Sequence, residues 1–135
     1  MKHFLFSVCF LFSSIIFSQS NFEKGAKLFD QKKYKEAKTY FNNYLNEYPS
    51  DIKTTEYLGD IAGIYKEWDE AIKCYEKIKK LNPQDANYHY KYGGALGMKA
   101  KESNKFAALG MIGDVEDAFL TAAKLDKTHI DSRWA

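Results

Sequence analysis

The sequence has few of the residues that cross-link or interrupt a chain. Its 135 residues include two cysteines, two prolines and eight glycines. Cys9 falls inside an apolar stretch near the start, and Cys74 has no second cysteine or histidine at metal-ligand spacing. We therefore expect neither an internal disulfide nor a metal site. The shortage of proline and glycine also argues against a disordered or fibrous chain.

An excess of charge of one sign is lacking too. The 20 basic and 18 acidic residues leave a net charge of +2, whereas nucleic-acid binding usually requires a clustered basic face. The densest basic run is Lys32, Lys33 and Lys35, and we expect it to lie in a solvated turn between helices. The sequence therefore predicts no nucleic-acid partner.

Motifs for catalysis are also missing. His89 and His129 have no nucleophile or carboxylate beside them at a motif spacing. The glycine-rich run 93–97 lacks both the preceding strand and the following Lys-Ser/Thr of a phosphate-binding loop. We predict no catalytic site and no cofactor, so an enzyme ranks last among the functions considered.

Residues 1–20 have the layout of an export signal. Lys2 begins a short positive start, Phe4 to Phe17 carry no charge, and small residues follow at Ser18 and Ser20. The apolar run is short for a membrane span, which needs about 20 residues. We expect a cleaved signal peptide, cut after Ser20 rather than Ser18, in preference to an uncleaved anchor. The mature chain would then be periplasmic or secreted, with no stable membrane span.

A repeat with one fixed offset runs through the middle of the chain. The same kinds of residue recur at four positions: a glycine, an alanine, an aromatic ring and a proline. The matched pairs are Gly25 and Gly59, Ala37 and Ala71, Phe41 and Tyr75, and Pro49 and Pro83. Because the offset is the same for all four pairs, the chain is predicted to be a stack of similar structural units.

This pattern resembles the tetratricopeptide-repeat (TPR) family, whose 34-residue unit is a helix–turn–helix. The family has small residues at the eighth and twentieth positions, an aromatic at the twenty-fourth and proline at the thirty-second, which are the positions of the matched pairs. The resemblance implies an all-α solenoid, wound as a right-handed superhelix. We expect helices near 21–32, 35–48, 52–65 and 68–81, with the small residues where helices cross and the prolines ending the second helices.

The third unit is irregular. Gly93 and Phe119 fit its eighth and twenty-fourth positions, yet the interval between them is ten positions longer than the interval from Gly59 to Tyr75. We expect the first helix of this unit, near 86–101, to be longer, the second to start early near Lys105, or both. On this division a domain covering 21–135 has repeats at about 18–51, 52–85 and 86–129.

The last residues resemble a subset of secreted bacterial TPR proteins. In that subset the chain continues through further helices after a motif similar to residues 129–135, His-Ile-Asp-Ser-Arg-Trp-Ala. The resemblance implies that a fourth unit begins at 130–135. A solenoid needs a polar helix over its last apolar face, and Trp134 is not such a cap. We therefore expect either a truncated chain or an end that a partner covers.

In TPR proteins the first helices of successive units line a concave groove. Carried over by position, the resemblance implies a partner-binding groove that includes Phe22, Phe29, Glu56, Asp60, Ile64, Tyr90 and Met98. The family's best-known carboxylate clamp has lysine and asparagine at the fifth and ninth positions, where the second unit here has Glu56 and Asp60. That clamp is absent, and an acidic middle between aromatic ends would suit an extended peptide with apolar and basic residues.

The predicted function is therefore a scaffold that binds a protein or peptide. Two other hypotheses remain besides it. The chain could be a structural or assembly segment of a longer polypeptide, in which the groove is only solvated surface, or it could be an enzyme.

Overall fold

The computed structural model describes residues 21–128, and every regular element in that range is a helix. The predicted signal peptide at 1–20 and the expected start of a fourth unit at 130–135 lie outside the described residues. No helix between residues 21 and 128 combines the length and the apolar character needed to cross a membrane.

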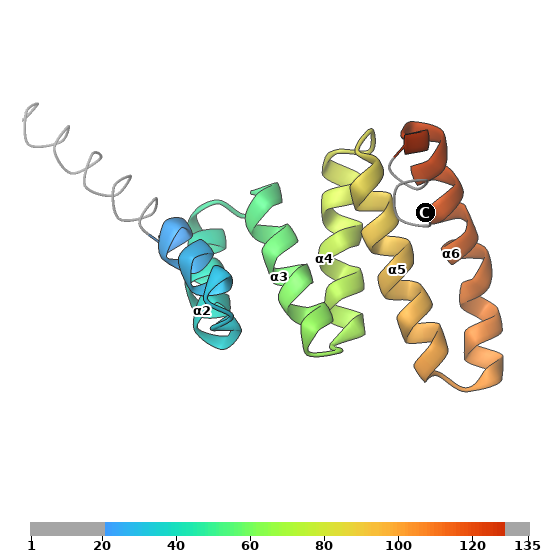
Figure 1. Ribbon diagram of the computed structural model, residues 1–135, viewed down its shortest axis with the longest axis horizontal. Coiled ribbons are helices and arrows are strands. Elements are labelled where there is room, and N and C mark those ends of the chain that lie inside the picture. The colour runs from blue at the N-terminus through green and yellow to red at the C-terminus, as the bar shows by residue number, and fades with distance from the viewer. Residues whose placement is uncertain (1–20, 129–135) are drawn as a thin grey trace, which may run out of the picture. The chain divides into compact units, whose positions relative to one another are not determined.

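The predicted helices are confirmed, with ends that differ by two residues or fewer. Figure 1 shows the helices in their order along the chain. Residues 21–30 form the first helix. It is followed by α2 (Tyr34–Glu47), α3 (Ile52–Ile64), α4 (Trp68–Leu81), α5 (Ala86–Glu102) and α6 (Lys105–Leu125).

The chain divides into two compact units between Thr54 and Thr55, inside α3. Unit 1 holds the helix at 21–30, α2 and the first turn of α3. Unit 2 holds the rest of α3 together with α4, α5 and α6. Each unit has buried residues of its own.

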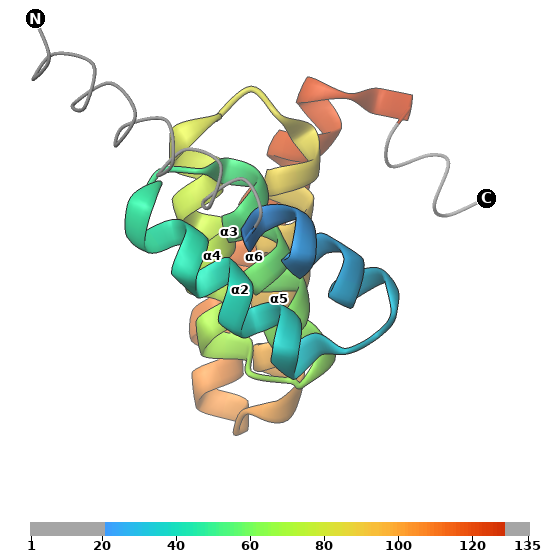
Figure 2. The same ribbon diagram turned by 90° about the vertical axis from the view of Figure 1, so that its left-hand side faces the viewer.

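In unit 1 the helix at 21–30 lies against α2 (Figure 2). A Cβ added at Gly25 would lie 2.7 Å from Cε1 of Phe41, a distance that side chains do not tolerate. Phe41 and the neighbouring Ala37 are both fully buried. Gly25 is therefore present because the ring occupies the space of a side chain, which offsets the cost of glycine inside a helix.

Unit 2 repeats this contact twice. A Cβ added at Gly59 would lie 2.6 Å from Cε1 of Tyr75, and one added at Gly93 would lie 3.0 Å from Cβ of Ala118 and 3.4 Å from Cε1 of Phe119. Phe119 is therefore the structural equivalent of Tyr75, as the sequence predicted across the ten extra residues.

The ten extra residues lengthen both helices of the third unit. α5 has 17 residues where α3 has 13, and α6 has 21 where α4 has 14. The turn at 103–104 is one residue shorter than the turn at 65–67, which accounts for the difference. The sequence left three arrangements open, and the structure has the one in which both helices grow.

Aspartates that follow the repeat prolines begin the next helices. The Asp51 carboxylate accepts the backbone N–H of Thr54 at 2.7 Å, and the Asp85 carboxylate accepts that of Asn87 at 2.9 Å. Both contacts satisfy donors that the first turn of a helix leaves without an intrahelical partner. The proline-x-aspartate motif thus ends one helix and caps the next.

The turns inside the two regular repeats each contain one strained residue, at the same position of the repeat. Lys32 has a φ of 61° and Lys66 a φ of 59°, and the two stand at equivalent positions of the first and second repeats. This left-handed conformation is unfavourable for a residue with a Cβ. The same backbone path therefore recurs in both repeats.

Candidate functional site

The predicted groove residues are divided between the two units. Unit 2 has Glu56, Asp60 and Ile64 on α3 and Tyr90 and Met98 on α5. The other two, Phe22 and Phe29, are on the first helix of unit 1. The part of the groove that one unit builds alone is the surface of α3 and α5, and we call it the α3–α5 surface.

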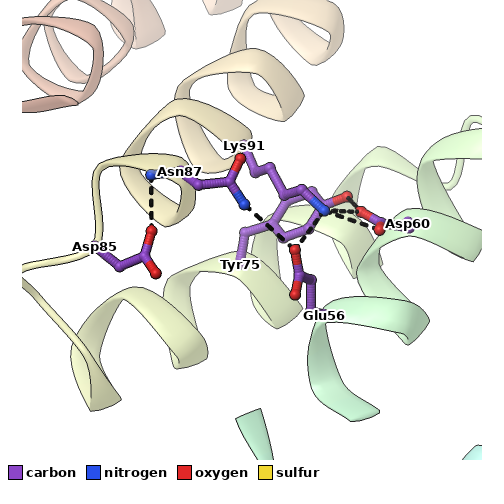
Figure 3. A network of polar contacts seen from close by, with 6 residues as sticks. All are labelled: Glu56, Asp60, Tyr75, Asp85, Asn87 and Lys91. Carbon is purple, nitrogen blue, oxygen red and sulfur yellow. Dashed lines mark hydrogen bonds and ion pairs between the residues drawn. The ribbon is translucent and has the colours of Figure 1, made fainter. Parts of the chain in front are cut away.

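A lysine that the sequence analysis did not single out lies at the centre of this surface (Figure 3). Nζ of Lys91, on α5, is 2.7 Å from Oε1 of Glu56 and donates to both carboxylate oxygens of Asp60 at 2.7 and 2.8 Å. The side chains of Lys91, Glu56 and Asp60 are 21%, 10% and 29% exposed. Ion pairs this sheltered from water interact much more strongly than pairs on an open surface.

Two neutral side chains complete the network. The hydroxyl of Tyr75, on α4, donates to Oδ1 of Asp60 at 2.6 Å, and the amide of Asn87 donates to Oε1 of Glu56 at 3.3 Å. Burial, followed by the hydrogen bond to Asp60, raises the pKa of the Tyr75 hydroxyl above its ordinary value. Tyr75 therefore acts as a neutral donor, and the network connects α3, α4 and α5.

These contacts change the predicted chemistry of the groove. Glu56 is 7% exposed as a residue and faces Lys91 and Asn87, so it presents little charge to a ligand. Lys91 also offsets part of the negative charge of Asp60. The acidic middle is therefore smaller than the sequence implied, and Asp60 is its more accessible member.

Exposed apolar residues lie on one side of the network. Ile64 lies one helical turn beyond Asp60 and is 47% exposed, and Met98 is 37% exposed on α5. A Cβ added at Gly94 would meet no atom within 4 Å, so the backbone is open to close approach there. The surface thus offers apolar contacts on one side of a charged centre.

The aromatic residues of the predicted groove serve their own units. The ring of Tyr90 lies 5.6 Å from that of Phe119, and both residues are half-buried. In unit 1, Phe22 packs against Phe41 and Tyr44, with ring centroids 6.2 and 5.5 Å away. Phe29 lies 5.3 Å from Tyr34 in an edge-to-face arrangement. The three groove rings are half-buried, so only part of each is available to a ligand.

Polar contacts near the solvent hold α5 against α4. The indole N–H of Trp68 donates to Glu102 at 2.8 Å, and Lys99 forms an ion pair with Asp69. The Asp69 side chain is 85% exposed, which makes this pair a solvent-screened counterpart of the Lys91 network on the same helix.

Residues 21–128 include no cluster of three or more His, Cys, Asp or Glu side chains placed to hold a metal ion. Cys74 is buried in the core. His89 lies with Nε2 2.8 Å from the carbonyl oxygen of Pro83, at the turn before α5. The burial of Cys74 and the backbone contact of His89 fit structural roles.

Comparison with known proteins decides the fold. No protein-family model matches the chain. A TPR repeat-containing protein of Methanocaldococcus jannaschii is 32% identical over 98 residues, which are 72% of this chain and 28% of that protein. The structure of a TPR protein of Thermus thermophilus matches with a TM-score of 0.70 at 15% identity, over 82% of this chain and 57% of that chain. The fold is that of a TPR protein.

A second similar structure is that of a TPR bound to a peptide. The first TPR of Spaghetti (RPAP3), bound to the HSP90 peptide SRMEEVD, matches with a TM-score of 0.65 at 19% identity, over 82% of this chain and 79% of that chain. This chain spans about a quarter of the length of its Methanocaldococcus relative and a little over half of the Thermus structure.

Proposed function

We propose that this TPR chain is a scaffold that binds an extended protein segment on its α3–α5 surface. The observation that carries the proposal is the pairing of exposed Ile64 and Met98 with open backbone at Gly94, next to a charged centre that the fold holds in place. A structurally similar TPR bound to a peptide supports the same general role.

The chemistry of the surface favours a segment with apolar residues and one basic residue. Ile64 and Met98 supply apolar contacts, and Asp60 keeps 29% of its side chain exposed beside them. The peptide bound by Spaghetti, SRMEEVD, carries three acidic residues. Glu56 and Asp60 stand where the carboxylate clamp of the family would have lysine and asparagine, so the cations that hold an acidic segment are missing. The exposed part of Asp60 favours a basic residue instead.

Selection from a random peptide library on the immobilised protein tests this proposal. We expect enrichment of peptides that combine aliphatic or aromatic residues with lysine or arginine. Ile64→Asp should weaken the binding of the selected peptides about 10-fold or more, because it places a charge in the apolar contact. When Asp60 is replaced by asparagine, the protein should lose part of its preference for peptides that contain a basic residue.

Leu81→Asp is the matched control. Leu81 is the last residue of α4 and is 45% exposed, much as Ile64 is the last residue of α3 and is 47% exposed. This control should leave peptide binding unchanged. Equal weakening by both variants, or enrichment of acidic peptides, would reject the α3–α5 surface as the binding site.

The proposed place of action is outside the cytoplasm. The layout of residues 1–20, with Lys2, an uncharged apolar run and Ser20, supports export. Expression of the full chain in a bacterium, followed by fractionation and mass spectrometry, should recover a protein that begins at Asn21 from the periplasm or medium. A cytoplasmic protein that retains residues 1–20 would contradict export.

A further inference from the structure

One side of α6 carries exposed apolar side chains. Phe106, Leu109, Ile112 and Leu120 are 87%, 58%, 53% and 48% exposed, and we call this set the α6 apolar face. Their spacing of three, three and eight residues places them along one side of the helix. The buried residues Ala118 and Ala122 lie on a different side, which packs against α5.

The corresponding side of α4 shows what such a face accommodates. Tyr75 and Phe119 are structural equivalents, so Glu76 and Lys79 on α4 correspond to Leu120 and Ala123 on α6. Glu76 and Lys79 are half-buried, and Nζ of Lys79 lies 3.8 Å from the centre of the Tyr92 ring on α5. A helix therefore covers this side of α4, and α6 presents an apolar residue, Leu120, where α4 has a charged one.

Two glycines open the α6 apolar face to close approach. A Cβ added at Gly110 or Gly113 would meet nothing within 4 Å, in contrast to Gly59 and Gly93, which each lie under a ring. Glycine weakens a helix interior relative to alanine. The packing within residues 21–128 gives no reason for glycine at these two positions, whereas a second helix crossing there would benefit from both.

We propose that the α6 apolar face binds the same face of a second copy of this chain. The two α6 helices are antiparallel, and the two-fold axis crosses them at the level midway between Gly110 and Met111. In this arrangement each residue meets the one equally far beyond the axis on the other helix. Leu109 of each copy then meets Ile112 of the other, so the centre of the interface contains two equivalent apolar contacts. This is the self-complementarity that a symmetric dimer requires.

The charged residues beside the face determine this register. Lys105 and Glu116 are exposed, and their spacing places both on the same side of α6 as Leu109 and Ile112. The proposed axis brings Lys105 of each copy level with Glu116 of the other, whereas parallel helices would place like charges together. The face is short, so the dimer belongs to the small, weak class of interfaces and its population depends on protein concentration.

Sedimentation velocity of the purified full chain over a range of concentrations tests the proposal. We expect the average mass to rise from that of one copy toward that of two. Leu109→Glu should shift the midpoint of this rise about 10-fold or more to higher concentration, because it places a charge against Ile112 of the other copy. Leu125→Glu is the control, because Leu125 is exposed near the end of α6 and its position along the helix places it on the side opposite Leu109.

Cross-linking tests the geometry independently of that variant. Ile112→Cys should form an intermolecular disulfide under mild oxidation, because the axis passes close to position 112 and brings the two introduced cysteines, one from each copy, near each other. Ala107→Cys, exposed on another side of α6, should not. Circular dichroism confirms that each variant folds, and the cross-linking decides the question if Leu109→Glu fails to fold.

Several results would overturn the dimer. They are a single-copy mass at every concentration, a rise that Leu109→Glu and Leu125→Glu affect equally, or a disulfide at Ala107→Cys rather than at Ile112→Cys. A single-copy protein in which residues 106–120 resist hydrogen exchange would show that another segment of the same chain covers the face. That result also overturns the proposal.

Discussion

Replacing Lys91 with methionine should destabilise unit 2 by about 2 kcal/mol. Methionine keeps most of the length of the side chain and removes its charge, so Glu56 and Asp60 lose their ammonium partner. Removing one partner from a fully buried ion pair costs about 3–5 kcal/mol. Lys91 is 21% exposed and Glu56 is 10% exposed, so water recovers part of that cost and the lower figure follows.

Lys99→Met is the control on the same helix. Lys99 also pairs with a carboxylate, but Asp69 is 85% exposed, and pairs of that kind contribute about 0–1 kcal/mol. Urea unfolding followed by circular dichroism should therefore give a lower midpoint for Lys91→Met than for Lys99→Met, at an unchanged slope. Equal stability of the two variants would refute the importance of the buried network.

A double-mutant cycle sharpens the test. Glu56→Gln combined with Lys91→Met removes the charges of both partners and keeps the amide contact from Asn87 possible. The double variant should be more stable than the sum of the single effects predicts, by about 1 kcal/mol. Strict additivity would mean that Lys91 and Glu56 are not coupled, which would leave Asp60 as the carboxylate that Lys91 stabilises.

The remaining predictions each concern a substitution at a single position. Gly59→Ala should lower the free energy of unfolding by about 1–2 kcal/mol, and with it the melting temperature, because its Cβ would lie 2.6 Å from the Tyr75 ring. Gly94→Ala should raise the free energy of unfolding by up to about 1 kcal/mol, and with it the melting temperature. A lower melting temperature for Gly94→Ala would contradict the open space there. Tyr75 has a raised pKa in the fold, so its stabilisation is fully present below about pH 10 and is lost as pH rises further. Urea titrations across that range should show a smaller loss for Tyr75→Phe than for the parent, and equal losses would refute the link. Lys66→Gly should stabilise the protein by about 0.5–1 kcal/mol in the same assay, because its φ is 59°, and a neutral or destabilising effect would show that the turn is not strained.

The repeat positions could be predicted because each has one packing reason. Gly59 and Tyr75 fit together as Gly25 and Phe41 do, and the contact recurs at Gly93. Wherever this contact occurs, the sequence has a glycine on the first helix of the unit and an aromatic residue on the second. The match of Phe119 therefore held even though the spacing before it had changed.

The sequence predicted a start of the second helix near Lys105 as one of three divisions of the ten extra residues, and α6 does begin there. Helix formation alone does not choose among the three. The segment that ends α5 and begins α6 contains no proline, so any division between the two helices was acceptable locally. Asn104 settles the division, since its side chain accepts the backbone N–H of Ala107 at 3.0 Å and begins α6. An asparagine three residues before that alanine was the available signal.

Lys91 was missed for a different reason. A lysine in a helix is usually solvated, and nothing local distinguishes this one. Its partners, Glu56 and Asp60, lie a whole repeat earlier in the chain, on a helix that approaches α5 only after folding. The available signal was the pair of carboxylates one turn apart on a helix expected to be largely covered, because sheltered carboxylates need a cation nearby.

The network also determines which substitutions can report on binding. Charge reversal at Glu56 would place a cation next to Lys91 at a site that is 10% exposed, so it would disturb the packing of α3 against α5 before any ligand is involved. A lost interaction in that variant would therefore say nothing about recognition. Ile64 makes the cleaner probe because 47% of its surface is exposed and none of the network passes through it. If Ile64→Asp leaves stability unchanged and abolishes peptide binding, recognition and folding use different residues of the same surface, and the network acts only by holding that surface in place.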